Sequence, residues 1–265
     1  MTNSELKYYE KLKFKKYRNE ENKFLIEGVH LIEECLRSSL YNGQTEKVFV
    51  REGSKNEELI SNINAVIPFI DIFYLDSKKF NKLSETENSQ GIIASVNKIP
   101  DNFPLRSEHQ NLKSNIVIAL DHINDPGNLG TIIRTCYWFD VKNIIVSEGS
   151  ADIYNSKTLR SSQGALFNVN IVNEADLADE LKRHDENNFK IILADLDSDK
   201  HLSEFVFDRN VNYVLVLGSE SNGISNEILS VKNYSKLKIK GFSDCESLNV
   251  GISLGIILYA AKKTI

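Results

Sequence analysis

From Asn115 onward, short runs of Ile, Val and Leu alternate with segments whose apolar residues recur every three or four positions. Continuous apolar runs indicate strands buried on both faces, and the wider spacing indicates helices. Strands that alternate with helices predict an α/β fold whose parallel sheet is covered on both sides. The expected strands are 116–120, 143–147, 190–195, 213–217 and 237–239, and the expected helices are 129–139, 157–164, 175–184, 226–231 and 248–263.

The first part of the chain has a different and shorter pattern. It predicts a small α/β unit with one basic helix before Phe24, strands at 24–28, 47–51, 71–75 and 90–96, and helices at 29–37, 57–64 and 77–83. Between the two parts, residues 97–114 contain two of the four prolines and have no clear periodicity. The expected organisation is therefore a domain at 1–96, a linker at 97–114 and a larger domain at 115–265.

Two of the expected strands in the larger part end in loops rich in Gly, Asn and Ser. The first loop places Asn128 at a helix N-terminus, where backbone N–H groups can meet an anion, and Arg134 follows where it could hold a phosphate. Taken alone, these two residues are explained more simply as a helix cap and a surface charge. The second loop sets Glu220 between Gly218 and Gly223, and glycines permit close backbone approach to a ligand.

A third polar loop runs through Glu246 to Asn249 and enters the last helix, where Gly251 and Gly255 stand four residues apart. This spacing puts both glycines on one helix face and favours close packing. If the strands are parallel, all three loops meet at the carboxyl edge of one sheet, where open α/β folds bind ligands.

Composition and motif content reduce the number of functions that the chain could have. The net charge of −5 and the sequence pI near 5.7 argue against a uniformly basic surface, although residues 7–23 hold seven basic residues among aromatic ones. That stretch suits RNA contact or, more simply, a solvated helix face. Motifs for dinucleotide, P-loop, zinc-protease and GxSxG hydrolase sites are absent, and the histidines show no metal-ligand spacing, so we expect no metal.

The chain also lacks the features of a membrane or exported protein. Its longest apolar run is far shorter than the roughly 20 residues that cross a bilayer, and its start has no apolar signal core. Three widely separated cysteines argue against a disulfide framework. We therefore expect a cytoplasmic protein with no membrane partner.

Together the loops resemble the SpoU branch of the SPOUT class of RNA methyltransferases. The resemblance rests on NLGTIIRT (128–135), LGSESNGI (217–224) and ESLNV (246–250), which have the family's order and separations. LRSSQGALFNV from Leu159 resembles the segment between the family's first two motifs. FLIEGVHLIEECL and SQGIIASV resemble the family's ribosomal-protein-like accessory RNA-binding domain.

The resemblance implies a knotted (trefoil) parallel-sheet domain, S-adenosylmethionine as cofactor, a homodimer whose site uses both subunits, and methylation of a ribose 2′-hydroxyl. That hydroxyl implies RNA and not DNA, with ribosomal RNA favoured over transfer RNA. The catalytic positions carried over are Asn128, Arg134, Glu220, Ser247 and Asn249. The cofactor-binding positions carried over are Leu217, Gly218, Gly223, Ile239, Ser247, Leu248 and Asn249.

One departure leaves alternatives open. Where the family has an Ile-Pro-Met-like segment followed by glycine, this chain has Ile239, Lys240, Gly241 and then Ser243. The wall of the cofactor pocket would change, while Lys240 could face solvent or RNA. An RNA-binding or ribosome-assembly factor with a degenerate cofactor site, and a small-molecule α/β enzyme, therefore stand beside the methyltransferase.

Overall fold

The computed structural model describes residues 1–99 and 116–264, so most of the expected linker at 97–114 lies outside the described residues. The chain forms two compact units. One contains the described residues up to position 99 together with Tyr154–Asn168, and the other contains residues from Ile116 to Ile153 and from Val169 onward. Every helix among the described residues is too short or too polar to span a bilayer.

The smaller unit is built on a four-stranded mixed sheet in the order β1-β4-β2-β3. β4 is antiparallel to both of its neighbours, whereas β2 and β3 are parallel. Leu6, Tyr9 and Leu12 pack with Phe49 and Phe80 in the core of this unit. Its elements are α1 (Asn3–Lys11), α2 (Lys15–Glu21), β1 (Lys23–Glu27), α3 (Val29–Arg37), β2 (Thr45–Arg51), α4 (Glu57–Val66), β3 (Asp71–Leu75), α5 (Ser77–Leu83), β4 (Ile92–Asn97) and α7 (Ser156–Ser162), followed by the 3₁₀ helix Ala165–Asn168.

The expected single basic helix is wrong, because α1 ends at Lys11 and α2 begins at Lys15. The buried guanidinium of Arg18 donates to the carbonyl oxygens of Leu12 (2.9 Å) and Lys13 (2.7 Å), which stabilises the break between the helices. β4 also begins two residues later than expected, at Ile92.

The segment Tyr154–Asn168 belongs to the smaller unit although it lies far along the chain. The ring of Tyr154 packs 4.4 Å from that of Phe24, and its hydroxyl lies 3.0 Å from the hydroxyl of Tyr41. Ser38 donates its hydroxyl proton to the carbonyl oxygen of Phe167, whose ring also packs against Tyr41. The core of this unit is therefore made from two separate stretches of sequence.

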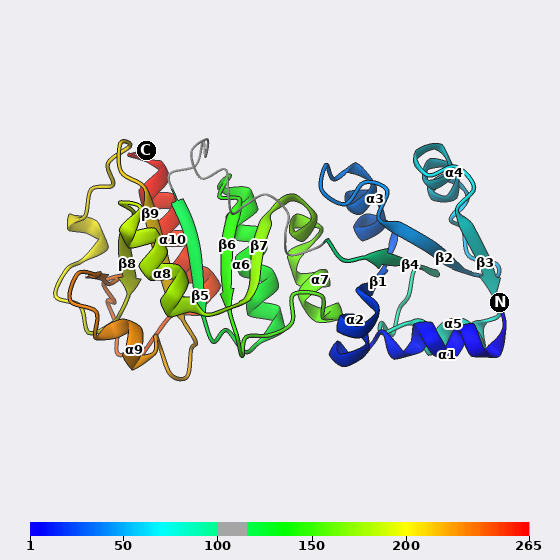
Figure 1. Ribbon diagram of the computed structural model, residues 1–265, viewed down its shortest axis with the longest axis horizontal. Coiled ribbons are helices and arrows are strands. Elements are labelled where there is room, and N and C mark those ends of the chain that lie inside the picture. The colour runs from blue at the N-terminus through cyan, green and yellow to red at the C-terminus, as the bar shows by residue number, and fades with distance from the viewer. Residues whose placement is uncertain (100–115, 265) are drawn as a thin grey trace. The chain divides into compact units, whose positions relative to one another are not determined.

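The larger unit is a six-stranded sheet in the order β10-β8-β9-β5-β6-β7, and all its pairings are parallel. The predicted parallel α/β fold is confirmed. α8 lies on one face, and α6 and α10 lie together on the other (Figure 1). The elements are β5 (Ile116–Asp121), α6 (Pro126–Trp138), β6 (Asn143–Ser147), β7 (Asn170–Ala175), α8 (Leu177–Glu186), β8 (Lys190–Ala194), β9 (Tyr213–Gly218), α9 (Asn226–Leu229), β10 (Ser235–Leu237) and α10 (Val250–Lys262).

Two predictions in this unit need correction. β7 was not expected, because its sequence NIVNEA is half polar and most of its residues are only partly buried at the sheet edge. The expected helix at 175–184 therefore begins later, at Leu177, with Asp176 as its cap. The last strand lies at Ser235–Leu237 and not at 237–239.

Candidate functional site

The loop after β9 is closed by its own backbone. Ser219 and Gly223 exchange two backbone hydrogen bonds of 3.1 and 2.9 Å, and the Ser219 hydroxyl accepts from the N–H of Asn222 at 3.1 Å. A Cβ on Gly218 would lie 2.1 Å from the carbonyl carbon of Gly223, so only glycine allows this approach. The tight turn holds Glu220 at the carboxyl edge of the sheet, with its side chain exposed.

Asn249 connects this loop to the start of α10. Its Oδ1 accepts from the N–H groups of Gly251 (3.0 Å) and Ile252 (3.3 Å), which makes it the N-cap of the helix. Its Nδ2 donates to Oε1 of Glu220 at 2.8 Å, an oxygen that also accepts from the N–H of Val250 at 3.4 Å. One amide side chain therefore fixes both a helix start and the Glu220 carboxylate.

The same Nδ2 also donates to Oδ1 of Asn128 at 2.9 Å. Asn128 stands in the first turn of α6, where its backbone N–H donates to the carboxylate of Asp125, the N-cap, at 2.8 Å. Pro126 at the first helical position fixes the backbone for this start. Asn128, Glu220 and Asn249, from three distant loops, thus form one hydrogen-bonded cluster, which we call the amide–carboxylate cluster.

Close packing of α6 on α10 makes this cluster possible. A Cβ on Gly251 would lie 3.0 Å from Cγ2 of Thr131, and one on Gly255 would lie 3.8 Å from Cγ2 of Thr135. Both threonine hydroxyls donate to carbonyl oxygens one turn earlier in α6, so their methyl groups meet the glycines. The expectation of close packing along the Gly251–Gly255 face is confirmed.

Other expected site residues lie outside the cluster. Arg134 is exposed on α6 and, within the described part of the chain, forms no ion pair or hydrogen bond with the cluster. Ser247 and Leu248 are exposed, Ile239 is half-buried, and Leu217 is buried in β9. The structure therefore brings together Asn128, Glu220 and Asn249. The other expected residues lie on α6, in β9 or its following loop, and in the segment between β10 and α10.

A further carboxylate at this edge was not anticipated from the sequence. Asp121, at the end of β5, is only 2% exposed, and its Oδ2 accepts from the N–H of Ser225 at 2.7 Å. Its Oδ1 lies 2.6 Å from Nδ1 of His122, a non-glycine residue with a φ of 53°. A cavity of about 310 Å³ opens beside the pair. The only sequence signal was a carboxylate at the end of an apolar run, because Ser225 lies 104 positions away.

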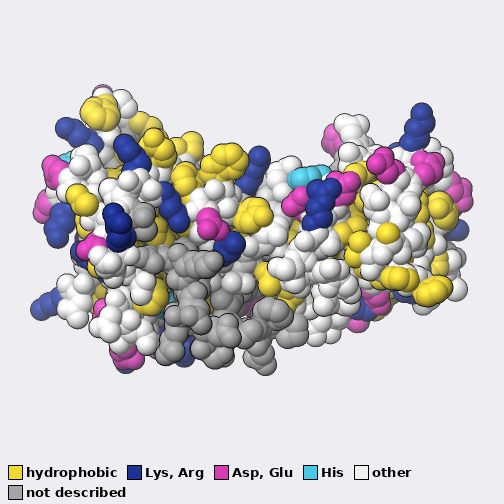
Figure 2. Space-filling model, turned by 90° about the horizontal axis from the view of Figure 1, so that it is seen from above, with side chains coloured by type: hydrophobic (Ala, Val, Ile, Leu, Met, Phe, Trp, Pro, Cys, Tyr) yellow, Lys and Arg dark blue, Asp and Glu magenta, His cyan; other side chains and the backbone are white. Residues whose placement is uncertain are grey.

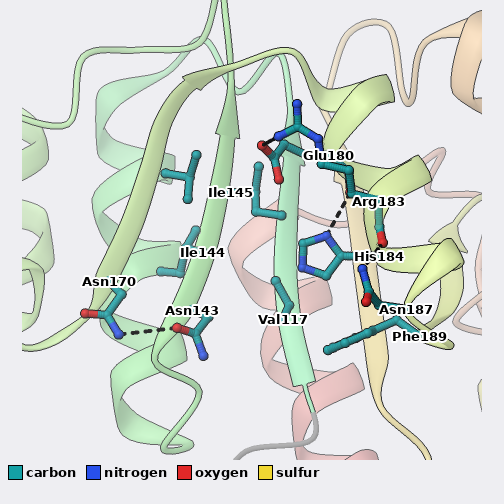
Figure 3. Close-up of a pocket in the computed structure, with 11 residues that line it drawn as sticks. Val117, Asn143, Ile144, Ile145, Asn170, Glu180, Arg183, His184, Asn187 and Phe189 are labelled. Atoms are coloured by element: carbon teal, nitrogen blue, oxygen red, sulfur yellow. Dashed lines mark hydrogen bonds and ion pairs between the residues drawn. The ribbon is translucent and has the colours of Figure 1, made fainter. Parts of the chain in front are cut away.

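The opposite edge of the sheet has a different character. A cavity of about 240 Å³ lies between the strands and α8, with Val117 and Ile145 on one side and His184 and Phe189 on the other (Figure 3). Its sheet side carries an amide pair in which Nδ2 of Asn170 donates to Oδ1 of Asn143 at 3.3 Å. The lining is mainly aliphatic and aromatic, so the chemistry of the unit is concentrated at the carboxyl edge.

This arrangement defines a parallel α/β protein whose polar loops assemble a site of amides and a carboxylate at the carboxyl edge of its sheet. A model of the SpoU rRNA Methylase family matches residues 115–259, and a model described as an MRM3-like substrate binding domain matches residues 3–94. The chain therefore belongs to the SpoU rRNA methylase family, and the resemblance seen in its motifs is confirmed.

Individual relatives agree with this assignment. The chain is 31% identical to the 23S rRNA (guanosine(2553)-2′-O)-methyltransferase RlmP of Bacillus subtilis, with 97% of this chain and 95% of that protein covered. It is 26% identical to a 23S rRNA (uridine(2479)-2′-O)-methyltransferase of Streptomyces viridochromogenes, over 93% of this chain and 84% of that one. An AdoMet-bound rRNA methyltransferase from Sinorhizobium meliloti has the same fold, with a TM-score of 0.84 at 24% identity, covering 99% of this chain and 95% of that one.

Proposed function

We propose that this chain transfers a methyl group from S-adenosylmethionine to a ribose 2′-hydroxyl of ribosomal RNA. The observation that carries the proposal is the amide–carboxylate cluster, in which Asn249 joins Asn128 and Glu220 at 2.9 and 2.8 Å. Relatives named as 23S rRNA 2′-O-methyltransferases align over nearly the whole chain. Those two relatives are named for a guanosine and a uridine, so they share the ribose 2′-hydroxyl as target and not the base.

The chain's loops fit the proposed cofactor. Gly223 has open space on its Cβ side, with no heavy atom of the described residues within 4 Å, and Ser247 and Leu248 are exposed before α10. The proposed holders are backbone groups of Leu217, Gly218, Gly223, Ile239 and Leu248, with Ser247 and Asn249 beside them. When bound, S-adenosylmethionine would supply an electrophilic methyl group.

The protein's own part in the reaction is mainly alignment. Transfer requires the ribose oxygen to lie in line with the methyl group, and positioned polar groups lower that entropic barrier. Asn128 and Glu220 would orient the ribose, since each has polar atoms beyond those held by Asn249. Arg134 would hold the neighbouring phosphate, because a guanidinium can donate two parallel hydrogen bonds to phosphate oxygens.

We also infer a homodimer. α10 exposes Ile252, Ile256 and Tyr259, which are spaced to share one helix face, and α6 exposes Trp138 (84%). Figure 2 shows exposed hydrophobic side chains among charged ones on one face of the molecule. Arg134 precedes Trp138 by one turn of α6. A partner subunit that covered Trp138 and the exposed residues of α10 would therefore lie close to Arg134, and both subunits would contribute to the site. Sedimentation of Ile252→Asp beside the unaltered protein tests this, and an unchanged sedimentation coefficient would contradict it.

The remaining features of the proposal come from the family. We propose a knot in which the chain between β9 and α10 passes through a loop, an RNA substrate-binding domain at 1–96, a linker at 97–114, a catalytic domain at 115–265 and a cytoplasmic location beside ribosomal RNA. Support for the domains comes from the two family models, which match 3–94 and 115–259.

The test is transfer of a tritiated methyl group from S-adenosylmethionine to unmodified ribosomal RNA, followed by nuclease mapping of the label. Label in one ribose is expected, and Arg134→Ala should lower kcat by about 100-fold or more. Arg183→Ala, an exposed arginine on α8 beside the cavity of Figure 3, is the matched control and should keep full activity. Binding of RNA without uptake of S-adenosylmethionine would instead favour an RNA-binding or assembly factor.

A further inference from the structure

The loop between β10 and α10 carries a cation paired with an exposed aromatic ring. Nζ of Lys240 lies 5.7 Å from the ring centroid of Phe242, whose side chain is 92% exposed. An exposed phenyl ring contributes little burial energy to the fold. The pair is only a few residues from Ser247 and Asn249, on the same loop that enters the amide–carboxylate cluster.

The charge of Lys240 is not balanced by a carboxylate within the described part of the chain. Lys236, at the start of the same stretch, is neutralised by Asp195 at 2.8 Å. Lys238 and Lys240 alternate with Leu237 and Ile239 beyond it, and neither forms an ion pair among the described residues, although Asp244 lies in the same loop. Two positive charges therefore follow β10 in the segment that leads to Asn249, on a protein whose net charge is −5.

We infer that Lys240 and Phe242 contact the RNA next to the target nucleotide, Lys240 through a backbone phosphate and Phe242 by stacking on an unpaired base. A lysine that neutralises a phosphate releases counterions, and an exposed ring stacks on any base. This inference rests on the proposed function. It assigns a role in RNA recognition to two residues of the segment in which this chain departs from the family's Ile-Pro-Met-like sequence. The smaller unit would bind other parts of the RNA, and this pair would fix the nucleotides flanking the reaction.

The test compares Lys240→Ala and Phe242→Ala with the unaltered protein in binding to in-vitro-transcribed 23S rRNA at several salt concentrations. Each variant should bind about 5- to 20-fold more weakly. Lys240→Ala should also lower the slope of log affinity against log salt by about one, whereas Phe242→Ala should leave that slope unchanged. The matched control is Lys190→Ala, which removes the cation of a second lysine–phenylalanine pair, Lys190 and Phe205 (5.1 Å). Lys190 is the first residue of β8 and therefore lies at the amino end of the strands, whereas the cluster lies at their carboxyl end.

Calorimetric titration with S-adenosylmethionine separates this inference from other roles of the loop. Unchanged cofactor affinity in both variants, with weaker RNA binding, supports it. A lowered cofactor affinity, RNA affinity equal to that of Lys190→Ala, or dissociation of a dimer would overturn it. None of these readouts depends on methyl transfer, so a failed transfer assay with the unaltered protein would count against the proposed function separately.

Discussion

Glu27 and Glu220 each organise a loop, but they do so in opposite ways. Glu27, at the end of β1, accepts from the hydroxyls of Ser84 (2.6 Å) and Thr86 (2.7 Å) and from the N–H of Glu85 (2.9 Å), so both of its oxygens are used. Glu220 accepts through Oε1 alone from groups in the described part of the chain, and its side chain is exposed. A carboxylate whose two oxygens both accept hydrogen bonds within its own unit stabilises the fold. A carboxylate with one oxygen that accepts no such bond can also bind a ligand.

The largest effect on activity is expected when the whole Glu220 carboxylate is removed. Glu220→Ala should lower kcat for methyl transfer by about 100-fold or more, because Asn249 loses its charged acceptor and Asn128 loses its fixed orientation. The free energy of unfolding should change by less than about 0.5 kcal/mol, since the side chain is exposed. Transfer kinetics and urea unfolding of the same preparation measure both quantities, and a large loss of stability would make Glu220 a structural residue like Glu27.

An intermediate effect on activity is expected at Asp121. Both of its carboxylate oxygens have hydrogen-bond partners, as in Glu27, but it lies at the carboxyl edge of the sheet, as Glu220 does. Asp121→Asn replaces one acceptor oxygen with a donor, so it disturbs either the Ser225 bond or the His122 bond. We expect kcat to fall about 10-fold and stability to fall by about 1–2 kcal/mol. His122→Ala keeps the Ser225 bond and should cost less in both measurements; equal costs would mean that the Ser225 bond does not position the loop of Glu220.

The smallest effect concerns Glu27 and is visible in its pH dependence. Burial tends to raise the pKa of Glu27, but hydrogen bonds from Ser84, Ser89, Thr86 and Glu85 outweigh it and hold the pKa below the usual value of about 4.3. The ionised group therefore stabilises the fold above pH 4.3, and this contribution is lost as the pH falls through the folded-state pKa. Glu27→Gln should be about 1 kcal/mol less stable at pH 7 and equal to the unaltered protein at lower pH, with kcat unchanged. A constant difference in unfolding free energy from pH 7 to pH 3 would show that ionisation of Glu27 has no part.

Much of the larger unit follows from local pattern. β5, β6, β8 and β9 are apolar runs buried in the sheet, and burial on both faces is what their sequences predicted. β7 was not predicted because an edge strand needs few apolar residues. β10 was predicted at 237–239 because lysines alternate with apolar residues there, but the strand ends at Leu237. In both cases tertiary pairing, and not local preference, sets the strand.

The site shows the same limit. The motifs identified Asn128, Glu220 and Asn249 as candidates. They did not show that one amide nitrogen, Nδ2 of Asn249, would donate to two acceptors that lie 29 and 121 positions away. Asp121 carried no motif at all, and its importance comes from a backbone N–H that only the folded sheet brings near. Long-range hydrogen bonds of this kind have no local signature in the sequence.

The two-part core of the smaller unit affects how the protein is made. Phe24 and Tyr41 leave the ribosome early, but Tyr154 and Phe167, the rings that pack against them, are translated more than a hundred residues later. Until then the nascent smaller unit exposes an aromatic surface and cannot finish folding. A fragment that ends before the sheet of the larger unit should therefore be aggregation-prone, and a soluble version of the smaller unit would need the 154–168 segment supplied on a grafted loop.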